Sequence, residues 1–339
     1  MTGRFTLTHR LTGNHASTSL RTDVLTGLAS RPRTLPPKWF YDARGSALFE
    51  EITRLPEYYP TRTEREILAA RAPEIAAATG ARTLVELGSG ASEKTRLLLD
   101  ALRDAGTLRG YVPVDVSDSA LRRSAHRLRV DYPDLDVHAV VADFGQHLGM
   151  SGSEAPRVLA FLGSTIGNLL PAERSAFLRR AREELEPGDT LLLGTDLVKD
   201  PGTLVAAYDD PAGVTAEFNR NVLAVLNREL GADFDLGAFE HVARWNAEKE
   251  WIEMRLRATR ELTVKIPAVD LVVSFERGEE LLTEVSAKFR PETVRAELAD
   301  AGLAATHCWT DPADHFALWL ATPVPAPVPS PNPGHPAPA

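Results

Sequence analysis

The sequence predicts an α/β fold, in which a doubly wound, mostly parallel sheet with an antiparallel last strand is joined to a second, α+β lobe. Between residues 83 and 197, five short apolar runs alternate with helical patterns, which is typical of parallel strands connected by crossover helices. After residue 200 this alternation stops, and a long amphipathic helix is followed by strands of period two. A hairpin-like ending, clearest at 316–320, then supplies the last strands.

The elements of the main lobe follow in order. The five apolar runs predict strands at 83–90, 110–117, 137–144, 157–164 and 190–197. Helical patterns lie in KTRLLLDAL, from Asp118 onward, and at 171–185. Each predicted helix has a start signal: Ser92 or Glu93 before the first, Ser117 or Asp118 before the second, and Pro171 at the third.

The second lobe is predicted from two further patterns. In GVTAEFNRNVLAVLNREL, apolar residues recur every four positions and indicate a helix: Phe218, Val222, Leu226 and Leu230. In WIEMRLRA, the alternation predicts a strand with Ile252, Met254 and Leu256 inward and with Glu253, Arg255 and Arg257 outward. The aromatic-rich N-terminal segment is expected to pack with this insertion. The predicted division is 1–62 for the N-terminal part of the second lobe, 63–200 for the main core, 201–286 for the insertion, 287–322 for the end of the core, and 323–339 for a disordered, proline-rich tail.

Composition excludes several classes of function. The 339 residues carry a net charge of -9 with no basic stripe, which argues against nucleic acid as a partner. The single cysteine, Cys308, forms no internal disulfide, and the histidines lack zinc-ligand spacing, so we expect a reducing cytoplasm and no metal. No run of about 18 apolar residues and no apolar leader is present, so neither a membrane segment nor a targeting segment is expected.

The segment ELGSGASEKT, at 86–95, is a glycine loop between a predicted strand and a helix, where backbone N–H groups favour negative charge. Glu93 stands where both a phosphate-binding P-loop and the dinucleotide fingerprint need glycine, which disfavours both. An acidic Glu86 before Gly88 and Gly90 is instead the usual opening of a class I methyltransferase fold, which binds S-adenosylmethionine.

The next two strand ends fit the same cofactor. Asp115 is placed to accept the ribose hydroxyls, and Asp143 to accept the adenine amino proton while the Phe144 ring packs on the base. Acidic strand ends are often only solvated, so an α/β domain with ordinary turns remains an alternative.

Six long blocks of the sequence are distinctive enough to identify a family: PPKWFYDARGSALFEEITRLPEYYPTRTE, LVELGSGASEKTRLLLDAL, YVPVDVS, FLGSTIGN, AYDDPAGVTAEFNRNVL and TEVSAKF. In these blocks, over residues 35–322, the chain resembles the histidine-specific, S-adenosylmethionine-dependent methyltransferases of ergothioneine biosynthesis. Enzymes of that family trimethylate the α-amino group of L-histidine to give hercynine. The resemblance implies S-adenosylmethionine as cofactor and L-histidine as substrate.

The resemblance also implies site residues. The cofactor-binding positions that it implies are Gly88, Lys94, Asp115, Asp143 and Phe144. Gly163 and Thr165 are added to them because the loop after the fourth strand can bring its backbone close to the cofactor. The substrate-binding positions are Tyr58, Asn168 and Tyr208 for the amino acid backbone, Glu284 and Ser286 for the imidazole, Phe49 beside the amine, and Met254 near the ring. Tyr41 and Asn168 are the expected catalytic residues, because Tyr41, or a relayed water, receives the amine proton while Asn168 holds the zwitterion.

The chemistry of imidazole suits the pair Glu284 and Ser286. Neutral imidazole has one N–H donor and one bare nitrogen, so a selective pocket needs one acceptor and one donor. Residues i and i+2 of a strand point to the same side, so Glu284 and Ser286 are expected to face one ring.

Other functions remain open from the sequence. In one alternative, the chain transfers the methyl group to another amino acid or to an aromatic amine. In the other, the chain is a cofactor-binding regulatory module without catalysis. By composition alone Asn168 is a helix N-cap ahead of LLPAER. A closed site within one chain predicts a monomer.

Overall fold

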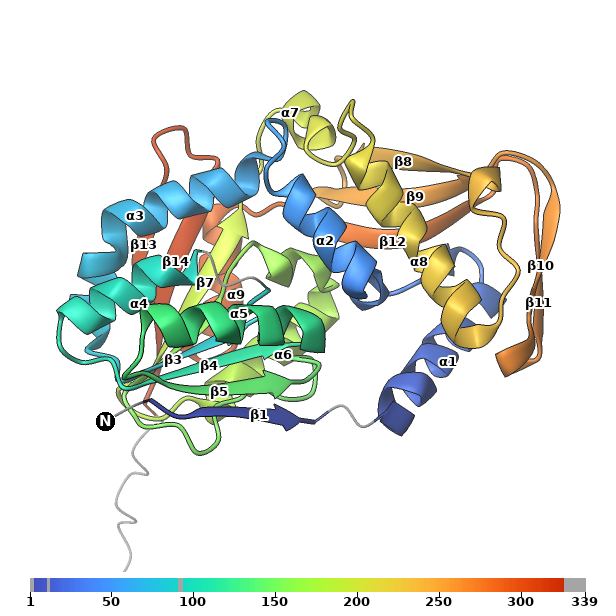
Figure 1. Cartoon of the computed structure of the whole chain (residues 1–339). Coiled ribbons are helices and arrows are strands. Elements are labelled where there is room, and N and C mark those ends of the chain that lie inside the picture. Colours follow the sequence, from blue (N-terminus) through green and yellow to red (C-terminus); the bar gives the residue numbers. More distant parts are fainter. Residues whose placement is uncertain (1–2, 11–12, 91–93, 326–339) are drawn as a thin grey trace, which may run out of the picture.

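The computed structural model describes residues 3–10, 13–90 and 94–325. At residues 13–16 it describes the backbone alone. Figure 1 shows two lobes, a sheet with helices on both faces and a smaller lobe built around a second sheet. The helix-start candidates Ser92 and Glu93, and residues 326–339 of the proline-rich tail, lie outside the described residues.

The main sheet has eight strands within the described residues. In spatial order they are β1 (Phe5–His9), β5 (Asp136–Val141), β4 (Gly110–Asp115), β3 (Thr83–Leu87), β6 (Arg157–Phe161), β7 (Thr190–Asp196), β14 (Phe316–Pro323) and β13 (Leu303–Thr310). Strands β5, β4, β3, β6 and β7 are parallel, and β14 runs antiparallel between β7 and β13. The predicted doubly wound sheet with an antiparallel last strand is therefore confirmed. The chain order of the strands reverses between β3 and β6, and ligands of such sheets bind beyond the carboxyl ends at this point.

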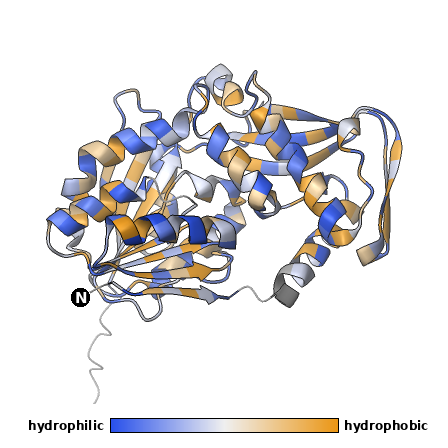
Figure 2. Ribbon diagram, in the orientation of Figure 1, coloured by the Kyte–Doolittle hydropathy of each residue, from blue (hydrophilic) through white to orange (hydrophobic). Residues whose placement is uncertain are grey.

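Helices cover both faces of this sheet because successive strand side chains point to opposite faces. One face packs against α3 (Tyr59–Thr79), α4 (Thr95–Asp104) and α5 (Asp118–Asp131), and the other against α6 (Pro171–Glu184) and α9 (Pro291–Asp300). Figure 2 shows the central strands as largely hydrophobic. Two predicted helix starts are confirmed: the Ser117 hydroxyl accepts from the Ala120 N–H of α5, and Pro171 is the first residue of α6.

The second lobe has a four-stranded sheet in the order β2 (Arg33–Thr34), β12 (Glu280–Ala287), β9 (Trp251–Ala258) and β8 (Phe239–Asn246). A hairpin of β10 (Leu262–Ile266) and β11 (Leu271–Phe275) extends from it. The helices of the second lobe are α1 (Gly13–Ala29), α2 (Ala43–Ile52), α7 (Pro201–Ala206) and α8 (Val214–Leu230). Its short 3-10 turns are η1 (Pro37–Phe40), η3 (Leu236–Ala238) and η4 (Pro267–Val269). The turn η2 (Thr165–Asn168) belongs to the main lobe. One hydrophobic core contains residues from 20–59 and from 204–281, so the N-terminal and inserted segments fold together.

Three details differ from the expectations. Residue 323 was expected to begin the disordered tail, but Pro323 is the last residue of β14 and pairs with Leu303. Segment 1–62 was assigned to the second lobe, but β1 pairs in parallel with β5 at the edge of the main sheet. Its five residues are half-buried or exposed, so they give little hydrophobic signal in the sequence. Glu253 was expected to face outward, but it is buried, because its carboxylate accepts hydrogen bonds from Trp251, Asn246 and Arg255.

Candidate active site

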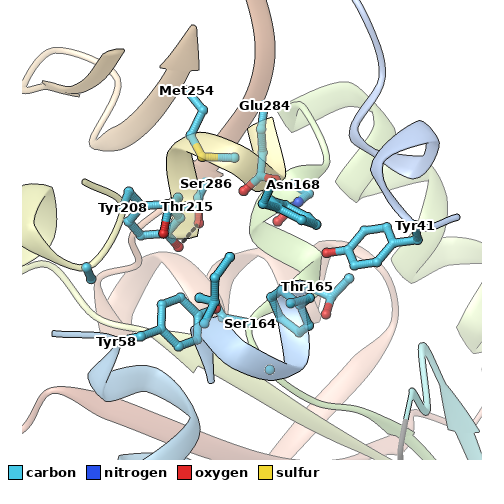
Figure 3. A pocket seen from close by; sticks show the side chains of 15 residues that line it. Tyr41, Tyr58, Ser164, Thr165, Asn168, Tyr208, Thr215, Met254, Glu284 and Ser286 are labelled. Atoms are coloured by element: carbon cyan, nitrogen blue, oxygen red, sulfur yellow. Dashed lines mark hydrogen bonds between the residues drawn. The ribbon is translucent and has the colours of Figure 1, made fainter. Parts of the chain in front are cut away.

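A pocket lies where the carboxyl end of β6 meets the second lobe. Its lining comes from both lobes: Tyr41, Phe49, Ile52, Tyr58, Gly163, Ser164, Thr165, Asn168, Ala207, Tyr208, Thr215, Phe218, Met254, Glu284 and Ser286. Figure 3 shows Glu284, Ser286 and Tyr208 on one side of the pocket, with Tyr41 and Tyr58 approaching from other elements. The structure thus brings together every residue that was expected to bind the substrate.

The loop after β6 places Asn168. Gly163 and Ser164 have φ values of 74° and 56°, so the chain turns sharply out of the strand before η2. The Ser164 hydroxyl accepts the backbone N–H of Asp196 at 2.9 Å, which fixes the loop to β7. Asn168 is not the N-cap of α6, since Leu170 occupies that position. Within the described part of the chain, the Asn168 amide has no hydrogen-bond partner, so it is free to bind a ligand.

Aromatic rings form a wall around the pocket. The Tyr41 ring centroid lies 5.6 Å from those of Phe49 and Phe218, and the Tyr58 centroid lies 6.2 Å from that of Tyr208. Burial raises the pKa of the Tyr41 and Tyr58 phenols well above the usual value. Both hydroxyls are therefore neutral at physiological pH and act as hydrogen-bonding groups rather than as phenolate bases.

Glu284 and Ser286 lie on β12 and face the same pocket. The Glu284 carboxylate is buried, and no group among the described residues forms a hydrogen bond with it. Burial raises the pKa of Glu284 to about 8, against the opposing effect of the Lys288 ammonium. When it is ionised, this carboxyl offers a ligand N–H group an acceptor that no described residue uses.

A buried charge cluster behind the pocket was not predicted from the sequence. It consists of Asp196, Lys199, Lys288 and Tyr59. The Lys288 ammonium donates to Tyr208 and Ser286, both of which line the pocket. The only signal in the sequence is a lysine directly after an apolar strand in TEVSAKF.

The expected cofactor residues lie at the carboxyl ends of β3, β4 and β5. Asp115 is buried, and its carboxylate accepts the backbone N–H groups of Gly90 at 2.9 Å and Ser117 at 2.8 Å. Gly88 has a φ of 65°, and its backbone N–H donates to the carbonyl of Val114. The loop from β3 is thereby bound to the end of β4.

Lys94 and Gly163 share one buried carboxylate. The Lys94 ammonium pairs with Glu64, and Glu64 also accepts the Gly163 backbone N–H at 2.7 Å. Glu64 is fully buried and lies on α3. It therefore joins the two loops on either side of the point where the strand order reverses.

The other two expected cofactor residues of this edge, Asp143 and Phe144, have partners within the protein. Asp143 lies 3.7 Å from the ammonium of Lys38 and borders a second cavity, of about 420 Å³, which Tyr41 also lines. The Phe144 ring packs against Phe161, with 5.1 Å between the ring centroids.

Glu86, the acidic residue before the glycine loop, anchors secondary structure. Its carboxylate accepts hydrogen bonds from Thr95, the first residue of α4, and from Tyr111 on β4. Burial raises the pKa of Glu86 to about 7.

Two kinds of feature are absent from the described residues. No helix there is long and apolar enough to cross a membrane. No group of three or more His, Cys, Asp or Glu side chains in these ranges is arranged to hold a metal ion.

The sequence matches one family model and several known proteins. Residues 20–323 match the family model described as histidine-specific methyltransferase, SAM-dependent. The chain is 61% identical to the histidine N-alpha-methyltransferase of Mycolicibacterium smegmatis, covering 93% of this chain and 98% of that one. It is 59% identical to the protein of the same name from Mycobacterium tuberculosis, over 89% and 94% of the two chains. Ergothioneine biosynthesis protein 1 of Neurospora crassa is 32% identical, over 82% of this chain and 32% of that longer protein.

Proposed function

Since the chain belongs to the histidine-specific, SAM-dependent methyltransferases, it is a methyltransferase, and we propose that it trimethylates the α-amino group of L-histidine. The product is then hercynine, and the reaction belongs to ergothioneine biosynthesis, as the names of its relatives suggest. The observation that carries this proposal is the pocket itself, where Glu284 and Asn168 present polar groups that no described residue binds, beside an aromatic wall.

The residues at the strand ends fit S-adenosylmethionine. Asp115 offers a buried carboxylate for ribose hydroxyls, and Asp143 lies at the end of the next strand for the adenine amino group. Lys94 supplies a cation for the carboxylate of the methionine part, next to the Gly163 loop. When bound, the cofactor supplies an electrophilic methyl group on a sulfonium.

The two ends of histidine need different partners. Tyr58, Asn168 and Tyr208 would hold the amino acid end, while Glu284 accepts the imidazole N–H and Ser286 donates to the bare ring nitrogen. Met254 is buried on the neighbouring strand β9 and limits the space for the ring.

The chain's contribution to catalysis is position, a dry site and control of the amine proton. An ammonium group has no lone pair, so each round of methylation requires a neutral amine. Burial among Tyr41, Phe49 and Tyr58 favours that form. Between rounds the ammonium proton passes to water. Tyr41 only accepts a hydrogen bond from the amine on this path, because its own pKa is too high for it to serve as a phenolate. The same rings stabilise the quaternary ammonium product by cation–π attraction.

The site also supports a monomer that acts in the cytoplasm. One chain supplies all the lining residues of the pocket, and the sequence contains a single cysteine. Size-exclusion chromatography with light scattering tests the monomer.

Mass spectrometry tests the function. Histidine incubated with the protein and S-adenosylmethionine should gain one, two and finally three methyl groups at the α-amino nitrogen. A panel of amino acids, including phenylalanine and tryptophan, serves as the control for acceptor choice. Methylation of these amino acids at the rate found for histidine would show a broader N-methyltransferase, and no methylated amino acid at all would contradict the proposal.

A further inference from the structure

Lys288 is a fully buried lysine directly after β12 whose hydrogen bonds are all accounted for. Its side chain has 0% exposure, and its ammonium lies 2.9 Å from each of three oxygens, on Asp196, Tyr208 and Ser286. An ammonium group has three donors and no acceptor. All three N–H groups of Lys288 are therefore used, two of them on hydroxyls that line the pocket.

The two hydroxyls also bind each other. The Tyr208 and Ser286 oxygens lie 2.8 Å apart, as the dashed line in Figure 3 shows. The distance allows either hydroxyl to donate. Because a phenol is intrinsically a stronger acid than an alcohol, the donor is assigned to Tyr208 and the acceptor to Ser286. A serine oxygen has two lone pairs, and here Lys288 occupies one and Tyr208 the other. Ser286 can then only donate, and its proton is available to the pocket.

We propose that Lys288 is a positioning residue that makes Ser286 an obligate hydrogen-bond donor to the substrate ring, and thereby requires Glu284 to be ionised in the histidine complex. This inference rests on the proposed function. The ring nitrogen that faces Ser286 must be bare, so in a neutral imidazole the other nitrogen carries the hydrogen. That N–H needs an acceptor, and a protonated Glu284 would present a second donor.

The proposal sets the proton balance of binding. In the free protein burial raises the pKa of Glu284 to about 8, so at pH 7 its carboxyl is mostly protonated. Binding of neutral histidine then forms the N–H···carboxylate bond and releases the Glu284 proton to the buffer. Histidine affinity should therefore rise with pH by up to about tenfold per unit between about 6.5, where free imidazole titrates, and about 8.

The groups that face Glu284 come from several elements. The phenols are Tyr41, Tyr58 and Tyr208, and the charged groups are Lys288 and, beyond it, Asp196 and Lys199. The phenols stay neutral because burial raises their pKa values. Between pH 6.5 and 8 Glu284 is therefore the group of the protein that titrates on binding. Any proton lost by the α-amino group of histidine is common to the wild type and the variants.

Calorimetry of histidine binding in two buffers of different ionisation enthalpy tests the proposal, with S-adenosylhomocysteine present and without turnover. The wild-type protein should release at pH 7 about one proton from Glu284, in addition to any proton that the α-amino group of histidine loses. In Lys288→Met, Ser286 regains a lone pair and accepts the ring N–H, so a protonated Glu284 can donate to the bare nitrogen. Proton release should then fall by about one proton relative to the wild type, and the Kd at pH 8 should rise by roughly tenfold. Equal or greater proton release in Lys288→Met would overturn the proposal.

Two further variants keep the test decisive. Tyr208→Phe also returns a lone pair to Ser286 but leaves the Lys288–Asp196 ion pair intact, so the expected loss of proton release can be measured even where Lys288→Met does not fold. Lys199→Met is the matched control, because Lys199 binds Asp196 and Tyr59 but not Ser286, and its proton release should equal that of the wild type. A wild-type protein that neither binds nor methylates histidine contradicts the proposed function, whereas binding without proton release contradicts this inference alone.

Discussion

At the scale of single residues, Glu284 shows how burial prepares a binding group. Its carboxyl is buried in a pocket, and among the described residues no side chain or backbone group forms a hydrogen bond with it. Ionisation in such surroundings is unfavourable, which is why its pKa is raised to about 8. A substrate N–H supplies the missing hydrogen-bond partner. Because ionisation of Glu284 is unfavourable without such a donor, the site selects ligands that carry one.

Replacing Glu284 should therefore change the pH dependence of stability. The pKa of about 8 in the folded protein lies above the usual glutamate value of 4.5. The stabilisation by the neutral carboxyl is therefore complete below pH 4.5 and is lost as the pH rises through 8. Glu284→Gln cannot ionise and escapes this loss. We therefore compare the unfolding free energy of Glu284→Gln with that of the wild type. The value for the variant minus that for the wild type should be about 3–5 kcal/mol larger at pH 9 than at pH 5.

Urea unfolding without histidine measures this difference. Glu248→Gln is the control, because the Glu248 side chain is 85% exposed and its replacement should shift stability equally at both pH values. A Glu284→Gln difference that is the same at pH 5 and pH 9 would show that the carboxyl has no raised pKa.

Most single residues of the pocket that were predicted lie in a distinctive block, and Met254 is the exception. Glu284, Ser286 and Asn168 all lie in such blocks, and all three line the pocket. Lys288 and Asp196 were missed, because a sequence does not tell which charged side chains near strand ends turn inward. Their burial depends on partners that are distant in the chain, such as Tyr208, 80 residues from Lys288.

At the scale of elements, the short turn η2 connects the two lobes. It packs on β12, and the closest approach is at Gly167, where an added Cβ would lie 2.8 Å from the Ala287 carbonyl oxygen. No pattern in the sequence indicates this contact. This glycine therefore sets the distance between Asn168 and Ser286.

Gly167→Ala should separate η2 from β12. A Cβ at 2.8 Å from a backbone oxygen requires the backbone to move, which typically costs about 1–3 kcal/mol of stability. Because Asn168 follows directly, the Kd for histidine should rise by at least about tenfold, as misplacement of one hydrogen bond predicts. Gly110→Ala is the matched control, since its Cβ would meet the nearest atom at 3.4 Å, in ordinary contact. Equal effects of the two substitutions on histidine binding would rule out this role for η2.

The elements themselves were largely predictable because their hydrophobic patterns are strong. All five parallel strands form where the apolar runs lie, and α8 spans the amphipathic pattern. The strand β1 was not predicted, because its partner is the exposed edge of β5 rather than a sequence neighbour. Edge pairing of this kind leaves no periodic signal in five half-polar residues.

At the scale of the whole molecule, the pocket exists because two lobes meet. Asp196 ends β7 of the main sheet, and its carboxylate binds Lys288, which follows β12 of the second lobe, together with Tyr59 at the start of α3 and Lys199. Ser46 and Ser117 add a contact of 3.3 Å between α2 and the start of α5. The two nearby cations hold the pKa of Asp196 below its usual value despite burial. This carboxylate therefore joins the lobes behind the substrate pocket.

Asp196→Asn should loosen this junction. The substitution leaves two buried lysines without their counter-ion, and breaking a buried pair on one side typically costs about 3–5 kcal/mol. Because Lys288 also loses one of its three anchors, the Kd for histidine should rise by at least roughly tenfold. Urea unfolding and calorimetry at pH 7 measure the two effects.

Asp189→Asn separates the role of this junction from a general loss of stability. Asp189 is fully buried, and its carboxylate pairs with Arg157 at 2.5 Å, but both residues belong to the main lobe. Its replacement should cost a similar free energy of unfolding and leave the affinity for histidine unchanged, because no pocket residue touches this pair. If both variants weaken histidine binding equally, the effect of Asp196 is one of stability alone. If Asp196→Asn loses stability but binds histidine as tightly as the wild type, the cluster holds the lobes together without ordering the pocket, and the hydroxyls of Tyr208 and Ser286 are positioned by each other.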